Sequence, residues 1–243
     1  IKLSDLRKVK GIGEKTIERI KNTLLKSKSD TYKSKYNPEL HLDINKIHYG
    51  DCLELMNGIK DKSIDMVLCD LPYGITGCNW DSSIDLDKLW RQYKRIIKDN
   101  GAIVLTASQP FTSNLVINNL DWFRCEWIWM KNAGSNFGCV KWQPMKEHES
   151  VLVFSKNTPK YNPIMQERAE SGKARIKTPV RTTTTKTDVY ADSLQKYSIA
   201  VKRDKLRYPS SIQKFNRERG LHPTQKPVAL FEYLIKTYTN EGD

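Results

Sequence analysis

No run of apolar residues in this sequence approaches the roughly 18 residues that a membrane span needs. The N-terminal residues also lack the apolar core of a signal peptide, so we expect a cytoplasmic protein with no membrane partner. The five cysteines include no CxxC pair, and His48 has no second ligand at metal spacing, so no metal site is predicted. Cys69 and Cys125 lie in apolar runs and are expected to be small core residues.

Acidic residues are in short supply: 28 Asp and Glu stand against 41 Lys and Arg, which gives a net charge of +13. The excess is confined to residues 1–37, with 11 basic and 4 acidic residues, and 156–219, with 16 and 6. Scattered lysines indicate only a solvated surface, whereas segregated ones favour surfaces that bind a polyanion. Nucleic acid is therefore the expected partner.

A short apolar run, Met66–Cys69, ends on Asp70 and is followed at once by Leu71, Pro72, Tyr73 and Gly74. The run predicts a buried strand, and the proline and glycine predict a turn. Asp70 would then lie at the carboxyl end of a strand, the edge where open α/β sheets bind their ligands. Ordinary turn chemistry is an alternative explanation of the same residues.

Strands and helices alternate along the rest of the chain, which is typical of a mostly parallel α/β sheet. Apolar spacing predicts a helix over residues 86–98, ended by Asn100-Gly101, and Pro227 introduces a second helix over 228–238. Further strands are predicted over 102–107, 123–130 and 151–154. Residues 132–147 are polar and contain glycine, which predicts a loop.

The N-terminal segment has apolar residues at helical spacing on both sides of Gly11-Ile12-Gly13. It resembles a helix-hairpin-helix element, whose role is to contact DNA phosphates without regard to sequence. Backbone amides around Gly11 and Gly13, supplemented by Lys10 and Lys15, suit an anion. A plain helical hairpin that packs on the main domain is the alternative.

Asp70-Leu71-Pro72-Tyr73, with Gly50-Asp51 before it and His222–Pro227 after it, resembles the β-type amino-group DNA methyltransferases of phages and bacteria. The segments 107–111 and 146–154 are similar to the same group, and the resemblance covers roughly residues 47–240. It implies a partial, mostly parallel Rossmann-like methyltransferase sheet with a small N-terminal helical hairpin and a basic insert. It also implies double-stranded DNA as substrate and a restriction endonuclease as a further partner.

The resemblance assigns catalysis to Asp70, Leu71, Pro72 and Tyr73. The Asp70 carboxylate and the Leu71 carbonyl would accept the N–H groups of an extruded base, Tyr73 would stack on it, and Pro72 would stiffen the turn. An acidic first residue favours adenine N6 over cytosine N4 as the methylated atom. A leucine stands where the family more often has proline, which leaves the carbonyl in place.

S-adenosylmethionine is the implied cofactor. Its implied contacts are Asp51, Cys52, Asp70, His222, Thr224 and Lys226. Asp51 is equally well explained as the N-cap of a short helix. The family pattern continues with a strand and a Gly-rich loop beyond the helix that follows Lys226. The sequence ends at Asp243 before such a loop, so we expect weak cofactor binding by these residues alone.

The predicted domains are a helix-hairpin-helix at 1–26, a linker at 27–43, the catalytic half at 44–155, a target-recognition insert at 156–219 and the cofactor motif with its helix at 220–243. The insert carries basic residues for phosphates and polar side chains for base edges, although a disordered loop has the same composition. In the 132–147 loop, Phe137 is a candidate to hold the extruded base. A catalytically inactive DNA-binding remnant and a cytosine-N4 methyltransferase are the alternative functions.

Overall fold

The computed structural model describes residues 35–74, 81, 84–176, 205–218, 220–222 and 224–243. The chain divides into two compact units, residues 1–60 and 61–243. Lys10, Gly11, Gly13 and Lys15 of the predicted helix-hairpin-helix lie outside the described residues, as do residues 177–204 and 219 of the predicted insert. Each unit is described by itself.

The described part of the first unit contains α3 (Cys52–Leu55) and the 3-10 helix η1 (Met56–Gly58). Asp51 is the N-cap of α3, because its side chain accepts a hydrogen bond from the Leu53 amide at 2.7 Å. The Asn37 amide donates to the Asn57 carbonyl at 2.7 Å. This bond joins residue 37 of the predicted linker to residue 57, which was expected to belong to the catalytic half.

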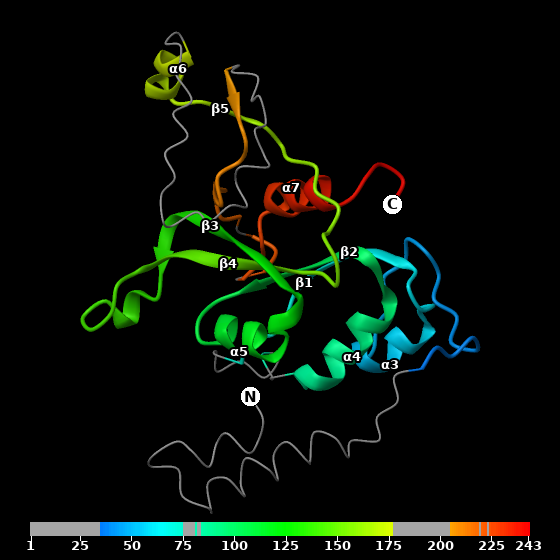
Figure 1. Ribbon diagram of the computed structural model, residues 1–243. Coiled ribbons are helices and arrows are strands. Elements are labelled where there is room, and N and C mark those ends of the chain that lie inside the picture. The colour runs from blue at the N-terminus through cyan, green and yellow to red at the C-terminus, as the bar shows by residue number, and fades with distance from the viewer. Residues whose placement is uncertain (1–34, 75–80, 82–83, 177–204, 219, 223) are drawn as a thin grey trace, which may run out of the picture. The chain divides into compact units, whose positions relative to one another are not determined.

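The second unit is an α/β structure (Figure 1). Its helices are α4 (Leu86–Ile96), α5 (Phe111–Asn118), α6 (Glu170–Ile176) and α7 (Val228–Tyr238), with the 3-10 helices η2 (Leu120–Trp122) and η3 (Phe137–Cys139). Its strands are β1 (Ile64–Asp70), β2 (Ile97–Ala107), β3 (Phe123–Ser135), β4 (Lys146–Phe154), β5 (Gln166–Glu167), β6 (Leu206–Arg207) and β7 (Ile212–Lys214).

The main sheet has the order β1-β2-β4-β3-β7, and β5 pairs with β6 in a separate two-stranded sheet. β1 runs parallel to β2, β3 runs parallel to β7, and β4 is antiparallel to both of its neighbours. Among the described strands of the main sheet, β4 alone opposes the others, which confirms the mostly parallel α/β fold. As a result, the carboxyl ends of β1, β2 and β3 meet the amino end of β4 at one edge.

The predicted end of a helix at Asn100-Gly101 is wrong, because α4 stops at Ile96 and β2 begins at the next residue. Ile64 faces Ile97 and Met66 faces Ala102, so a two-residue step on β1 meets a five-residue step on β2. Asn100 and Gly101 lie within this irregular part of the β1–β2 pairing. A Cβ on Gly101 would lie 2.7 Å from the Asp65 carbonyl oxygen and 2.8 Å from Ile97 Cγ1.

We expect Gly101→Ala to lower the free energy of unfolding by about 1–3 kcal/mol, because the added methyl group meets backbone that cannot move aside. Gly138→Ala is the matched control, since a Cβ there meets nothing within 4 Å. Urea denaturation of both variants measures the difference. Equal stability of the two variants would show that the β1–β2 irregularity tolerates a side chain.

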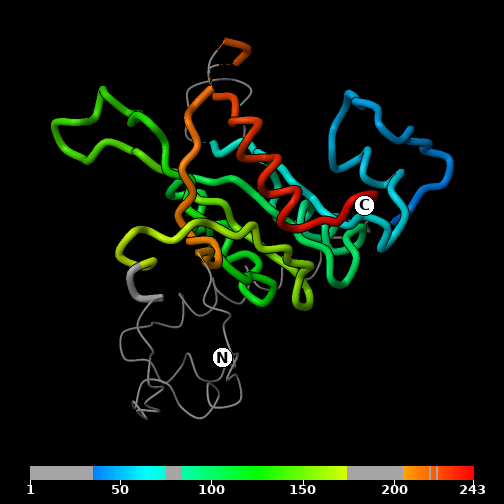
Figure 2. Tube along the Cα trace, turned by 90° about the horizontal axis from the view of Figure 1, so that it is seen from above, coloured from blue at the N-terminus to red at the C-terminus, as the bar shows by residue number. Residues whose placement is uncertain are grey.

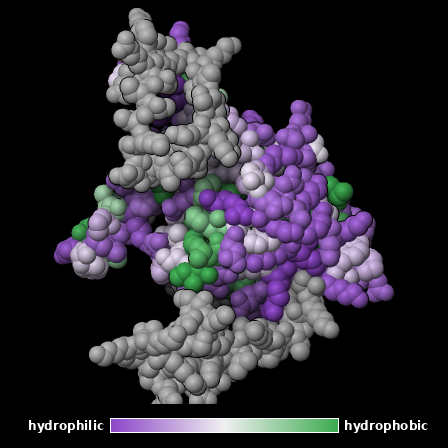
Figure 3. Space-filling view, viewed as in Figure 1, coloured by the Kyte–Doolittle hydropathy of each residue, from purple (hydrophilic) through white to green (hydrophobic). Residues whose placement is uncertain are grey.

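The β3–β4 hairpin projects from the sheet as an arm of the second unit (Figures 1, 2 and 3). The prediction of a loop over residues 132–147 is therefore wrong at both ends. β3 continues to Ser135, β4 begins at Lys146, and these two residues face each other in the ladder. The local composition favours a loop, but cross-strand pairing extends the strands.

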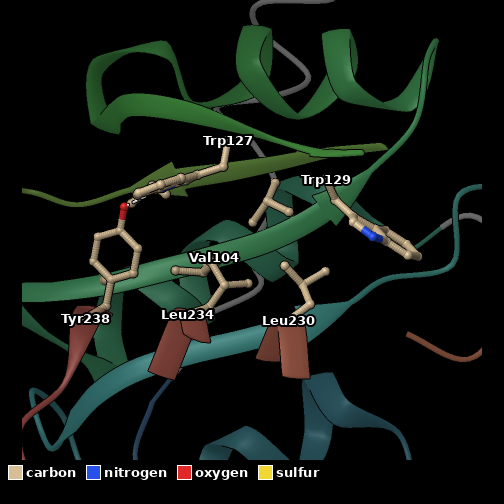
Figure 4. Packing of buried hydrophobic residues seen from close by; sticks show 9 residues of the cluster. Val104, Trp127, Trp129, Leu230, Leu234 and Tyr238 are labelled. Atoms are coloured by element: carbon tan, nitrogen blue, oxygen red, sulfur yellow. Dashed lines mark hydrogen bonds between the residues drawn. The ribbon is translucent and has the colours of Figure 1, made fainter. Parts of the chain in front are cut away.

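Helices cover both faces of the main sheet. Leu230, Leu234 and Tyr238 of α7 pack against Trp127 and Trp129 of β3, and the Tyr238 hydroxyl accepts from Trp127 Nε1 at 2.7 Å (Figure 4). α4 and α5 lie on the opposite face (Figure 1). On that side Trp90 meets Phe154 edge-on, with 4.8 Å between the ring centroids. Packing on both faces of the sheet holds the carboxyl ends of β1, β2 and β3 in fixed positions.

Within the described part of the chain, no helix is both long and apolar enough to cross a membrane.

Cys69 is half-buried, whereas Cys125 is exposed, so the prediction that Cys125 belongs to the core is wrong. Cys125 lies near the start of β3, where its neighbour Phe123 rather than the thiol packs against Phe154.

Candidate functional site

A cavity of about 440 Å³ opens in the second unit, where β1, β2 and β3 end and β4 begins. Cavities of about 300–1,000 Å³ are typical of small-molecule sites. The predicted catalytic residues Asp70, Leu71, Pro72 and Tyr73 all line it. β3 adds Trp129 and Lys131, β4 adds Lys146, His148 and Glu149, and the segment before α7 adds Thr224, Gln225 and Lys226.

Asp70 ends β1, and its side chain is held by three donors. Thr106 Oγ1 donates to Oδ1 at 2.5 Å and the Tyr73 hydroxyl donates to the same atom at 3.1 Å. Lys226 Nζ donates to Oδ2 at 2.9 Å. Thr106 reaches the carboxylate because it is the register partner of Asp70 on β2. A carboxylate offers about four acceptor positions, so these three donors, counted among the described residues, leave one position for a ligand N–H.

Asp70 belongs to a charge network with Lys131, Glu149 and Lys226. Lys131 Nζ lies 2.6 Å from Glu149 Oε1, and Lys226 Nζ lies 3.4 Å from Glu149 Oε2. The side chains of Lys131 and Lys226 are only 6% and 8% exposed, whereas that of Asp70 is 32% exposed. Two buried ammonium groups are thus balanced by two carboxylates, and the more open carboxylate faces the cavity.

Strand pairing builds this network. Trp129 faces Glu149 across the β3–β4 ladder, and Lys131 lies two residues further along β3, as a diagonal neighbour of Glu149. Lys226 arrives from the other direction, immediately before Pro227, which is the N-cap of α7. The packing of α7 on the sheet therefore delivers its ammonium group to Asp70.

Tyr73 is fixed in place by its ring and by its hydroxyl. The ring stacks on Phe111, with 5.4 Å between centroids and 25° between planes, and Lys226 Nζ lies 5.3 Å from the ring centroid. Burial, and then the carboxylates of Glu149 and Asp70, raise the pKa of the Tyr73 phenol far above its usual value. The hydroxyl consequently stays protonated and acts as a hydrogen-bond donor.

The His222–Pro227 segment forms a turn anchored by Glu218. Glu218 accepts from Gln225 Nε2 at 3.2 Å and from the Val228 amide at 3.0 Å. His222 is exposed, and its Nδ1 accepts from the Thr224 amide at 3.3 Å. Thr224 and Lys226 line the cavity together with Arg217, whose buried Nε has no hydrogen-bond partner among the described residues. This edge of the cavity thus has a donor available for an anionic ligand group.

A protein-family model described as DNA methylase, N6_N4_Mtase, matches residues 64–243 of the chain. The chain belongs to this DNA methylase family. Similar proteins include the Type II methyltransferase M.HpaI of Haemophilus parainfluenzae, 24% identical, with 80% of this chain and 60% of that protein covered. DNA adenine methyltransferase YhdJ of Escherichia coli K12 is 26% identical, with coverage of 81% and 68%.

The chain also shares its fold with a solved structure. The PvuII DNA methyltransferase, described as cytosine-N4-specific, superposes with a TM-score of 0.50 at 14% identity over 79% of this chain and 70% of that one. The α/β Rossmann-like methyltransferase fold is therefore confirmed. The chain spans 60% of the length of M.HpaI and 38% of that of the Type II methyltransferase M.HinfI of Haemophilus influenzae.

The other predicted site residues belong to other elements of the chain. Asp51 and Cys52 belong to the first unit, where Asp51 caps α3. Phe137 is exposed on the hairpin arm and does not line the cavity. Within the described residues, no group of three or more His, Cys, Asp or Glu side chains is placed to hold a metal ion.

Sequence reasoning missed Thr106, Lys131, Glu149 and Arg217. A signal was present for two of them: Lys131 follows the apolar run of β3, and Glu149 precedes that of β4. Oppositely charged residues at adjoining ends of two buried strands predict an ion pair if the two strands are neighbours in the sheet. The strand order that makes them neighbours is a property of the fold and could not be read from the sequence.

Proposed function

We propose that this DNA methylase transfers a methyl group to the exocyclic N6 of an adenine that has been rotated out of duplex DNA. The observation that carries the proposal is the Asp70 carboxylate, which lines the cavity and keeps one acceptor position that no described residue fills. A base inside a duplex cannot reach a cavity of this kind, so the target nucleotide has to be extruded.

The amino nitrogen of adenine is a weak nucleophile because its lone pair is delocalised into the ring. An acceptor on each of its N–H bonds localises the lone pair as the new bond forms. We assign these acceptors to the Asp70 carboxylate and the Leu71 carbonyl. Positioning and preorganised acceptors, rather than a strong base, would supply the acceleration.

The surrounding residues keep Asp70 in a single orientation. Thr106, Tyr73 and Lys226 hold its two oxygens, and Glu149 holds Lys226. Phe111 fixes the plane of the Tyr73 ring, which supports the assignment of Tyr73 as a stacking surface for the base. Pro72 limits the conformations of the turn that carries the Leu71 carbonyl.

The donors beside the cavity fit the carboxylate of an amino-acid-bearing ligand. Arg217 has a free buried Nε, and Thr224 and Lys226 line the same wall. S-adenosylmethionine, when bound, supplies the methyl group as an activated sulfonium. We propose that Arg217, Thr224 and Lys226 hold its amino-acid end, and that Asp51, Cys52 and His222 also contribute to the cofactor site.

Adenine is our proposed target because the first residue of the tetrapeptide is acidic, and the adenine specificity in the name of YhdJ supports it. To test this, the full-length protein is incubated with S-adenosylmethionine and mixed-sequence duplex DNA, and the nucleosides are then analysed by mass spectrometry. We expect N6-methyladenine. N4-methylcytosine would overturn the base assignment, and the absence of both products would overturn the enzymatic proposal.

The Type II names of several relatives support a place in a restriction–modification system, with a restriction endonuclease as a further partner. Residues 156–219 are proposed to read the target sequence. Their described part includes β7, which joins the main sheet beside β3, and Arg217 of the cavity. Residues that read the duplex would thus continue directly into the wall of the catalytic cavity.

A further inference from the structure

The far end of the hairpin arm, residues 136–146, exposes large apolar side chains. We call these residues the hairpin tip. Phe137 is 64% exposed and Trp142 is 72% exposed, and Val140 and Met145 are exposed beside them. Pale and green atoms mark part of this end of the arm in the space-filling view (Figure 3). Several large apolar residues gathered on one projecting element indicate a surface that contacts a partner.

The hairpin tip is ordered by its own hydrogen bonds. Asn136 adopts a left-handed conformation at φ 61°, and its side chain accepts from the Lys146 amide at 2.8 Å and donates to the Pro144 carbonyl at 3.3 Å. The Trp142 amide donates to the Cys139 carbonyl at 3.1 Å. The aromatic side chains are therefore presented on a fixed backbone, which lowers the entropy cost of binding.

The position and charge of the hairpin tip identify the kind of partner. Ser135, Asn136 and Lys146, at the base of the tip, also line the catalytic cavity. The tip contains Lys141 and Lys146 and no acidic residue. An apolar surface flanked by cations at the mouth of a base-binding cavity suits DNA, and the like charges disfavour pairing with a second copy of the same tip.

We propose that the hairpin tip inserts Trp142, supported by Phe137, into the base stack of the duplex at the gap from which the target base is extruded. The inference rests on the proposed function. Extrusion removes the stacking partners of the neighbouring bases, and an inserted aromatic ring replaces them. Apolar wedges on DNA-binding proteins separate base steps in the same physical way.

The test compares the affinity of the full-length protein for two duplexes, one intact and one with a single abasic site, by fluorescence anisotropy. We expect wild type to prefer the abasic duplex. Trp142→Ala should weaken binding to that duplex by about 10-fold or more and remove the preference, as expected for the loss of one aromatic–base stack. Trp142→Phe should keep most of the affinity for the abasic duplex and most of the preference for it. Ile117→Ala, an equally exposed apolar residue on α5, is the matched control and should leave both affinities unchanged.

Three results overturn the inference. One is an unchanged preference in Trp142→Ala, and another is an equal loss in Ile117→Ala. The third is sedimentation showing that wild type self-associates and that Trp142→Ala is a monomer, which would make the tip a protein interface. Each of these leaves the proposed function intact if wild type still methylates DNA. Absence of both DNA binding and methyl transfer would instead overturn the proposed function.

Discussion

Asp70→Ala reduces the rate of methyl transfer to DNA by at least about 10²–10³-fold, the cost of removing one preorganised group that stabilises a transition state. The carboxylate is the acceptor through which the cavity would hold the amino group of the base. Its loss leaves the fold intact, because Lys226 keeps Glu149 as an ionic partner. Steady-state rates with labelled S-adenosylmethionine on duplex DNA measure the effect.

Asp65→Ala is the matched control for this experiment. Asp65 is on the same strand and pairs with Lys98 at 2.6 Å, but it does not line the cavity. We expect it to retain nearly full activity. The methyl-transfer rate of Asp70→Asn should lie between those of Asp70→Ala and Asp65→Ala, because asparagine keeps one acceptor oxygen and loses the charge. Comparable rates for Asp70→Ala and Asp65→Ala would show that the carboxylate does not contact the reacting base.

Glu149→Gln lowers the free energy of unfolding by about 3–5 kcal/mol, the effect of removing one partner from a buried ion pair. The substitution leaves the ammonium group of Lys131, which is 6% exposed, without a charged partner among the described residues. It also frees Lys226 and Tyr73 from one of their contacts, so we expect lower activity at temperatures where the variant is folded. Urea denaturation and methyl-transfer rates measure the two effects.

Glu147→Gln controls for a change of charge on β4, because Glu147 is exposed two residues before Glu149 on the same strand. We expect the free energy of unfolding of Glu147→Gln to differ from that of wild type by no more than about 0.5 kcal/mol. The double variant Lys131→Met, Glu149→Gln should recover much of the lost stability, because the stranded ammonium group is then gone. Failure of the double variant to recover would show that Glu149 stabilises the fold through contacts other than Lys131.

The position of Asp70 could be predicted because it depends on local signals. An apolar run makes the strand, and Pro72 and Gly74 end it, so the carboxylate falls at the sheet edge. Helix α7 could be predicted for the same reason, from Pro227 and an unbroken apolar face. Asn100-Gly101 gave a misleading signal, because a turn-forming pair serves equally well inside an irregular strand.

The rest of the cavity depends on contacts between residues far apart in the sequence. Thr106 and Glu149 reach it through strand pairing, and Lys226 reaches it from 156 residues beyond Asp70. The hairpin arm was not predicted, because residues 132–147 have the composition of a loop. Their two ends become strand only because each pairs with the facing strand. Local propensity therefore located the Asp70 carboxylate at the cavity, and long-range pairing supplied the residues that hold it.

Binding of the adenine base beside Asp70 tests the central claim most directly. Crystals of the protein soaked with 2′-deoxyadenosine 5′-monophosphate should show the base in the cavity, against Tyr73. The amino nitrogen should lie about 2.7–3.2 Å from an Asp70 carboxylate oxygen, at hydrogen-bond distance. A base bound outside this cavity, or bound inside it with the amino group directed away from Asp70, would contradict the account.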